Sequence, residues 1–199
     1  MMPNRIVLAT GNPGKIREIQ SILEPYLIVP QSDFDVPNVE ETGTTFVENA
    51  IIKARNAAKH SGLPAIADDS GIEVDALNGA PGVRSARYSG PAADDQQNLD
   101  KLLQEMISVV DDHRNARFRC VIVYMRHAED PCPIITEGTW EGTILRQSRG
   151  ANGFGYDPVF LLPELGCTSA ELAPDQKNRL SHRAQALNTL AEQLEKSRL

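Results

Sequence analysis

The sequence has no long run of apolar residues and no surplus of positive charge. Its 199 residues carry a formal net charge of -7, with a sequence pI of about 5.1. Such a chain is poorly suited to non-specific binding of nucleic acid or of an anionic membrane surface. The first residues lead into a strand-like segment, 6–9, without an apolar signal region, and nothing approaches membrane-spanning length. We therefore expect a soluble, untargeted cytoplasmic protein without nucleic-acid or membrane partners.

Cysteine is also scarce. Cys120, Cys132 and Cys167 form an odd set without C-x-x-C spacing, which indicates neither a disulfide framework nor a zinc site. With 41% hydrophobic residues, the chain can bury a full core. No repeat, low-complexity tract or linker divides it. We expect a single domain over residues 1–199, built as one compact unit or as two closely joined lobes.

In the segment 65–71, an apolar run is followed directly by two adjacent carboxylates, Asp68 and Asp69. Residues 65–67 are typical of the end of a buried strand, and ligands of α/β proteins bind beyond such strand ends. A carboxylate there could bind a hard cation or activate water. Because successive side chains of an extended chain alternate in direction, Asp68 and Asp69 cannot both face one ligand unless the strand has already turned. Asp-Asp-Ser-Gly is also typical of a plain turn, and this alternative stays open.

A glycine-rich turn, residues 10–15, follows the first predicted strand and precedes a helix with Ile16, Ile19 and Leu23 at helical spacing. Such a turn leaves backbone N–H groups at a helix N-terminus available to phosphate oxygens, and Lys15 adds positive charge. The spacing G-x-x-G-K is too short for a Walker A loop. Glycine at this place can also serve steric needs alone.

A capping box that starts at Thr45 begins a second predicted helix, which runs to about Lys59. The loop before it carries Glu40 and Glu41, which could reach a metal held by the acidic turn. Lys53 lies off the apolar stripe of this helix and could reach a phosphate. An ordinary exposed loop and an ordinary solvated lysine are common alternatives.

The segment 150–160 interleaves glycines with aromatic residues. This combination suits the stacking of a nucleobase, or equally a turn whose aromatic side chains fill the core. Farther on, residues 174–178 are predicted to be exposed. A final helix is predicted to begin near Ser181, a plausible N-cap, followed by His182 and Arg183.

Taken together and in order, these features closely resemble the inosine triphosphate pyrophosphatase family, whose members hydrolyse non-standard purine nucleoside triphosphates. The resemblance spans Arg5 to about Leu187. Each motif is weak by itself, but the set of motifs in this order is specific. The motifs are Thr10-Gly11-Asn12-x-x-Lys15, Glu40-Glu41-Thr42-Gly43-x-Thr45-Phe46-x-Glu48-Asn49-Ala50, Ala67-Asp68-Asp69-Ser70-Gly71, Pro81-Gly82-x-x-Ser85-Ala86-Arg87, Gly153-Phe154-Gly155-Tyr156-Asp157-Pro158 and Ser181-His182-Arg183. Small departures at 175–176 and at Ala184 touch no residue assigned to chemistry.

The resemblance implies an elongated α/β fold with a mixed sheet flanked by helices, two lobes around a central active-site cleft, and a homodimer. It also implies roles for individual residues. Glu40 and Asp69 would bind Mg²⁺, Asp69 would also activate water, and Ser70 would contact the substrate. The triphosphate would be held by Thr10, Gly11, Asn12, Pro13, Gly14, Lys15 and Lys53. The base pocket would comprise Phe154, Gly155, Tyr156, Asp157, Lys177, His182 and Arg183.

The implied reaction is attack of water on the α-phosphorus of ITP, dITP or XTP, which releases the monophosphate and pyrophosphate and clears these nucleotides from the pool. A carboxylate beside Mg²⁺ stays ionised, which favours Asp69 as the base, with Asp68 or Glu41 in reserve. Hydrogen-bond donors at His182 and Arg183 would favour a purine with a 6-oxo group over adenine, which carries a 6-amino group. They do not explain how guanine is rejected. The alternatives are a non-catalytic nucleotide sensor and a pyrophosphatase for modified pyrimidine or 7-methylated nucleotides.

Overall fold

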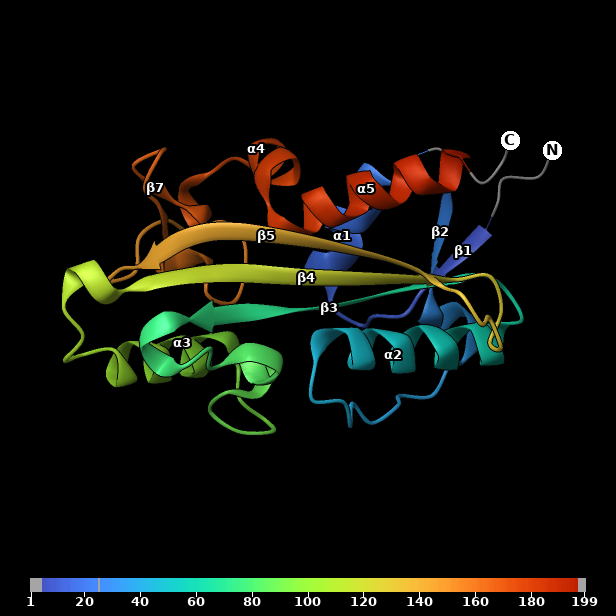
Figure 1. Cartoon of the computed structure of the whole chain (residues 1–199), viewed down its shortest axis with the longest axis horizontal. Coiled ribbons are helices and arrows are strands. Elements are labelled where there is room, and N and C mark those ends of the chain that lie inside the picture. Colours follow the sequence, from blue (N-terminus) through green and yellow to red (C-terminus); the bar gives the residue numbers. More distant parts are fainter. Residues whose placement is uncertain (1–4, 25, 197–199) are drawn as a thin grey trace. The chain divides into compact units, whose positions relative to one another are not determined.

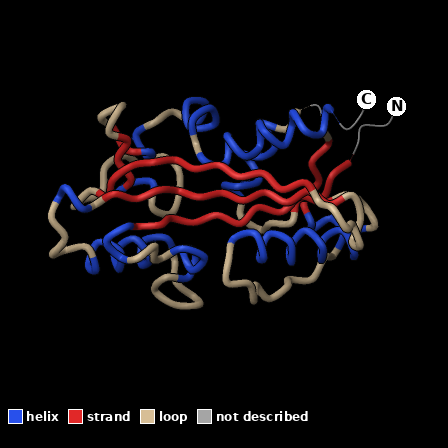
Figure 2. Tube along the Cα trace, in the orientation of Figure 1, coloured by secondary structure: helices blue, strands red, loops and turns tan. Residues whose placement is uncertain are grey.

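The computed structural model describes residues 5–24 and 26–196. Within this part of the chain, seven strands form one mixed sheet in the order β2-β1-β3-β4-β5-β6-β7, drawn in red in Figure 2. The pairs β1–β2 and β1–β3 are parallel, whereas β5–β6 and β6–β7 are antiparallel. The strands are β1 (Arg5–Leu8), β2 (Leu27–Pro30), β3 (Ala65–Val74), β4 (Asn115–Met125), β5 (Ile134–Ile144), β6 (Phe160–Leu162) and β7 (Cys167–Thr168).

Helices flank the sheet, so the predicted α/β class is confirmed. They are α1 (Pro13–Ile22), α2 (Phe46–Ser61), α3 (Asp95–Glu105), α4 (Pro174–Leu180) and α5 (His182–Lys196). None of the helices in the described ranges is both long and apolar enough to cross a membrane.

The chain divides into two compact units. Unit 1 contains the described residues up to Asp69, Cys120–Gly138 and the described residues from Arg183 onward. Unit 2 contains Ser70–Arg119 and Thr139–His182. Strands β3, β4 and β5 contribute residues to both units, and each unit has a hydrophobic core of its own.

In unit 1, the alternation of side chains along the strands builds two core layers. Ile6 and Leu8 of β1 pack with residues of α1 and α5 on one face of the sheet. Val7 packs on the other face against the alanine stripe of α2, so the strand is buried on both sides (Figure 1). The same parity holds along β3, where Ile66 joins the first layer and its neighbours Ala65 and Ala67 join the second.

The ends of α2 are set by local chemistry, and the predicted start at the capping box is confirmed. Thr45 is the N-cap, and its side chain and that of Glu48 form a reciprocal capping box. At the other end, Gly62 adopts φ 66°, a left-handed conformation that favours glycine. The helix is therefore fixed at both ends before any tertiary contact is considered.

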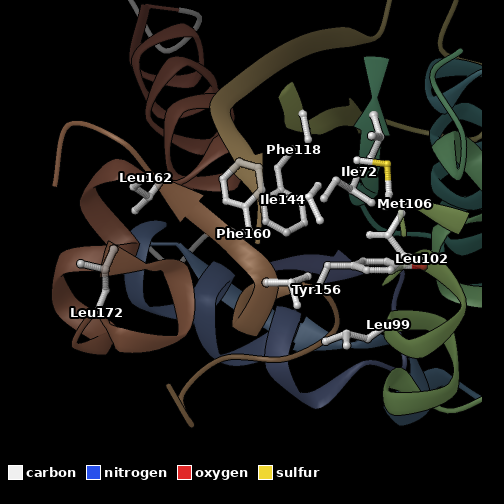
Figure 3. Packing of buried hydrophobic residues seen from close by; sticks show 13 residues of the cluster. Ile72, Leu99, Leu102, Met106, Phe118, Ile144, Tyr156, Phe160, Leu162 and Leu172 are labelled. Carbon is white, nitrogen blue, oxygen red and sulfur yellow. The ribbon is translucent and has the colours of Figure 1, made fainter. Parts of the chain in front are cut away.

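The core of unit 2 is built around aromatic side chains (Figure 3). The ring centroids of Phe118 and Phe160 lie 4.4 Å apart, and Tyr156 is buried in the same cluster. Gly142 of β5 is required here, because a Cβ at this position would lie 2.6 Å from the Phe160 ring. The absence of a side chain at Gly142 thus leaves room for the Phe160 ring.

Several predicted boundaries are wrong. The strand expected to end at residue 67 continues to Val74 as β3, and β5 runs unbroken from Ile134 to Ile144. In β5 the polar Glu137 is exposed while its neighbours Thr136 and Gly138 are buried, so alternation continues through it. Residues 174–178 belong to α4 and are not all exposed, since Lys177 is buried.

Helix α3 ends at Glu105. Beyond it, the guanidinium of the buried Arg114 donates hydrogen bonds to the carbonyl groups of Met106 and Val109. It also donates to Ile144 and Leu145. These bonds satisfy carbonyl groups after the helix end, which helps the chain to leave the helix early.

Candidate active site

The two carboxylates of β3 lie on opposite faces of unit 1. Asp68 follows the parity of Ile66 and faces α1 and α5, whereas Asp69 follows the parity of Ala67 and faces α2. The expectation that both cannot face one ligand is confirmed. The alternative of a plain turn is wrong, because the strand continues through both residues.

Asp68 joins two cations from distant parts of the chain. It is 1% exposed, and its Oδ2 lies 2.9 Å from Lys15 Nζ and 3.2 Å from an Arg183 nitrogen. Arg183 also contacts Glu18 of α1. Burial opposes ionisation of Asp68, but the charges of Lys15 and Arg183 outweigh it and hold the pKa of this carboxyl well below its usual range. Asp68 is therefore a buried anion that holds Lys15 and Arg183 together.

Asp69 faces a different partner set on α2. Its Oδ1 accepts a hydrogen bond from Lys53 Nζ at 2.7 Å, and its Oδ2 accepts one from Asn49 Nδ2 at 3.4 Å. Burial raises the pKa of the Asp69 carboxyl, although Lys53 acts in the opposite direction. A buried carboxylate with raised proton affinity, held by two donors, is suited to accept a proton from water.

Lys53 connects Asp69 with the loop that precedes α2. Its Nζ also lies 3.2 Å from Glu41, so two carboxylates share one ammonium group. Burial would lower the pKa of Lys53, but the neighbouring carboxylates, Asp69 foremost, raise it overall. Lys53 is therefore a fixed positive charge beside Asp69.

The acidic side chains of this part of unit 1 fit magnesium in their chemistry. Asp69 and Glu41 present hard oxygen donors, and Mg²⁺ is usually held by one or two carboxylates together with substrate phosphates. In the described ranges, no three acidic, histidine or cysteine side chains gather into a metal cage. The predicted ligand Glu40 is exposed, whereas its neighbour Glu41, which was held in reserve as the water-activating base, contacts Lys53.

The predicted phosphate loop has the expected strand, turn and helix. Asn12 caps α1, since its Oδ1 accepts hydrogen bonds from the backbone N–H groups of Gly14 at 2.8 Å and of Lys15 at 3.2 Å. The N–H of Asn12 donates to Thr10 Oγ1 at 3.1 Å, and Pro13 occupies the first turn. The turn is thus held by its own hydrogen bonds.

Asp157 is the centre of the predicted base-binding residues in unit 2. Its carboxylate accepts hydrogen bonds from Lys177 Nζ at 2.6 Å, Ser169 Oγ at 2.7 Å and the Phe154 N–H at 2.8 Å. The Lys177 ammonium also lies 4.7 Å from the centroid of the Phe154 ring. Gly153 is required beside it, with φ 78°, because a Cβ would lie 2.0 Å from Asp157 Oδ2.

The neighbouring residues of unit 2 are also held by internal contacts. The hydroxyl of the buried Tyr156 donates to the carbonyl of Ser85 at 2.8 Å, and the Gly155 N–H donates to Asp95. His182 stacks on Phe118 with ring centroids 4.8 Å apart. Ser70, the first residue of unit 2, is half-buried in β3.

The structure thus gathers the predicted residues into separate groups. Asp68 with Lys15 and Arg183, and Asp69 with Lys53, lie in unit 1, whereas the Asp157 group lies in unit 2. Sequence reasoning did not assign a role to Asn49, Glu18 or Ser169. Asn49 was detectable as a polar residue one turn before Lys53, and Glu18 as an acid one turn after Lys15. Nothing local marks Ser169 as a partner of Asp157.

Comparisons with known proteins agree with one another. The sequence model of the Ham1 family matches residues 6–193. A dITP/XTP pyrophosphatase of Thioalkalivibrio sulfidiphilus is 61% identical over 193 residues, covering 96% of this chain and 98% of that protein. The corresponding enzyme of Vibrio cholerae is 59% identical over 196 residues, covering 98% of each chain. Among solved structures, a HAM1 protein from Coxiella burnetii aligns with a TM-score of 0.90 at 52% identity, covering 96% of this chain and 98% of that one. The Ham1 protein of Staphylococcus aureus aligns with a TM-score of 0.87 at 43% identity, covering 97% and 99%.

Proposed function

The chain belongs to the Ham1 family, and from this membership we propose that it is a nucleoside triphosphate pyrophosphatase that hydrolyses dITP, XTP and ITP. The products are the nucleoside monophosphate and pyrophosphate, so the enzyme clears non-standard purine nucleotides before they enter DNA or RNA. The resemblance to the inosine triphosphate pyrophosphatase family is confirmed by relatives named for this activity. The observation that carries the proposal is the buried Asp69, held between Lys53 and Asn49.

In the proposed reaction, Asp69 accepts a proton from water as the water oxygen forms a bond to the α-phosphorus. The bond from this phosphorus to the bridging oxygen of the pyrophosphate group breaks, and pyrophosphate leaves with the electron pair. An Asp69 carboxylate that is ionised beside a bound cation can accept this proton. Its hydrogen bonds to Lys53 and Asn49 keep it oriented, which lowers the cost of reaching the reactive geometry.

Two lysines of unit 1 are proposed to bind the phosphate chain, together with the capped loop that contains Thr10 and Gly11. Lys15 extends from the N-terminal turn of α1, where the helix dipole also favours an anion. Lys53 provides a second charge beside Asp69. As each ammonium is already paired with a carboxylate, an incoming phosphate meets oriented rather than mobile cations.

Magnesium is proposed as the cofactor, held by Asp69 and by a glutamate of the loop, either Glu40 or Glu41. When bound, the ion would offset negative charge on the phosphate oxygens. Without it, the carboxylates of this group would repel the triphosphate, and the lysines alone would have to compensate. The donor chemistry of Asp69 and Glu41 supports this assignment.

Recognition of the base is proposed for Phe154, Asp157, Lys177 and His182, which all belong to unit 2. A role of Arg183 in selectivity stays a prediction from the family resemblance. Lys177 and the Phe154 ring combine a cation with a flat apolar surface, a pairing that suits an oxygen-bearing purine. The homodimer is likewise a proposal that rests on the family resemblance, whereas the proposed cytoplasmic location rests on the scarcity of cysteine. Light scattering of the purified protein tests the dimer.

A hydrolysis panel tests the proposed function. Purified protein is incubated with dITP, XTP, ITP, dGTP and dATP, with and without Mg²⁺, and both monophosphate and pyrophosphate are quantified. We expect equal amounts of the two products from the non-standard purines. Asp69→Asn should lower kcat by about a hundredfold or more, because it removes the proton acceptor. Release of inorganic phosphate instead of pyrophosphate, or full activity of Asp69→Asn, would refute the assignment. Binding without turnover would identify a nucleotide sensor.

A further inference from the structure

One face of α2 carries three polar side chains directed at the same region of unit 1. Asn49, Lys53 and Asn56 are spaced four and three residues apart, so they lie on one side of the helix. Lys53 contacts Asp69 and Glu41. The two asparagines contact the segment 37–43, which we call the acidic loop because it carries Glu40 and Glu41.

Asn49 joins the acidic loop to the proposed catalytic base. Its side chain is fully buried, its Oδ1 accepts a hydrogen bond from the Gly43 N–H at 2.8 Å, and its Nδ2 donates to Asp69 Oδ2 at 3.4 Å. Both ends of one amide are therefore used. Gly43 leaves the necessary space, because a Cβ there would lie 2.6 Å from Asn49 Oδ1.

Asn56 holds the other end of the acidic loop. Two turns along α2, its Nδ2 donates to the carbonyl oxygen of Pro37 at 2.8 Å. The loop is thus tied to the helix at its first and last residues, and Glu40 and Glu41 lie between these ties. A tether at each end limits the positions that the two carboxylates can sample.

We propose that Asn49 and Asn56 are positioning residues that hold the acidic loop beside Asp69, ready for a divalent cation. The inference rests on the proposed function, since it assigns these asparagines to the same site. A neutral amide suits this task, because it can restrain carboxylates without neutralising the charge that attracts the cation. Asn56 acts on the loop alone, whereas Asn49 acts on both the loop and Asp69.

Three variants and a control separate these roles. Asn56→Ala removes only the tie at Pro37, and Asn49→Ala removes the ties to Gly43 and Asp69. Asn49→Asp keeps an acceptor for the Gly43 N–H but loses the donor to Asp69. The matched control is Arg55→Ala, which removes a side-chain bond from the same helix to a different segment, at the carbonyl of Ala128.

Two measurements are made on each variant. The first is dITP hydrolysis as a function of Mg²⁺ concentration, which gives the concentration for half-maximal activity and kcat at saturation. The second is the amide hydrogen exchange rate of Gly43 by NMR in metal-free protein, which needs neither metal nor substrate. Circular dichroism and a thermal melt verify that each variant is folded.

We expect Asn56→Ala to raise the Mg²⁺ concentration for half-maximal activity by about fivefold while kcat stays within about twofold, the effect of losing one hydrogen bond that orders the loop. Asn49→Ala should show at least the same shift, lower kcat by about tenfold, and speed exchange at Gly43 by about fivefold. Asn49→Asp should lower kcat with exchange at Gly43 close to that of the unchanged protein. Arg55→Ala should change neither quantity.

The inference is overturned if Asn56→Ala keeps the original Mg²⁺ dependence, or if Asn49→Ala leaves exchange at Gly43 unchanged. Asn56 is only half-buried, so its variant remains informative even if Asn49→Ala does not fold. A failure of the proposed function is distinguishable, because the unchanged protein would then release no pyrophosphate from dITP while the exchange measurement still reports the tie at Gly43.

Discussion

Replacing Asp68 by asparagine should destabilise the protein and lower its activity at the same time. The change preserves shape and removes one negative charge from a position that is 1% exposed. Lys15 and Arg183 then face a neutral amide, and Arg183 is itself almost fully buried. The variant therefore leaves buried positive charge without its main counter-charge.

The size of the effect follows from these contacts. Removing one partner of a buried ion pair typically costs about 3–5 kcal/mol in the free energy of unfolding. Arg183 keeps its contact with Glu18, and the Lys15 side chain is 16% exposed and can regain some hydration. We therefore expect the lower end of the range, about 3 kcal/mol. The loss of a fixed position for Lys15 should lower kcat/KM for dITP by about tenfold or more.

Urea unfolding at neutral pH measures the first quantity, and pyrophosphate release from dITP the second. Glu18→Gln is the matched control, because it removes the more exposed carboxylate of the Arg183 pair and leaves Asp68 in place. It should cost less stability than Asp68→Asn and leave Lys15 oriented. If Asp68→Asn unfolds within about 1 kcal/mol of the unchanged protein, Asp68 does not act as the required counter-charge.

The remaining predictions concern selectivity and pH. Arg183→Ala should weaken the preference for ITP over ATP, measured by kcat/KM for each nucleotide, more than it lowers the affinity for Mg²⁺; equal losses on ITP and ATP would count against a role in reading the base. Hydrogen bonds from Arg126 hold the pKa of the Asp130 carboxyl well below its usual range. Asp130 therefore contributes stability that is present above the unfolded-state value of about 4 and is lost as the pH falls through its lowered folded-state value. Urea unfolding between about pH 6 and pH 2.5 should show a smaller acid-induced loss in Asp130→Asn than in the unchanged protein, and equal losses would contradict this.

Local sequence was sufficient for elements that depend on neighbouring residues. The capping box at Thr45 involves contacts within a few residues, and the continuous apolar run at residues 6–9 is typical of a buried strand; both are present in the structure, as the start of α2 and as β1. The order of short motifs was also sufficient for the family. Alternation along the chain even predicted that Asp68 and Asp69 diverge.

Only the tertiary structure decided which partners the site residues have. Residues 65–74 form one strand in which Asp68 and Asp69 meet cations from helices on either face, and no local pattern indicates those contacts. The partner of Asp68 at Arg183 lies 115 residues away. The packing of distant elements likewise decides that Lys177 pairs with Asp157, and that Lys53 pairs with Glu41 and not with Glu40. The sequence by itself determined which residues can carry charge and which face of each helix or strand they occupy. The tertiary structure determined which of those charges come into contact, because contacts between remote segments are set by how the layers of helices and strands pack.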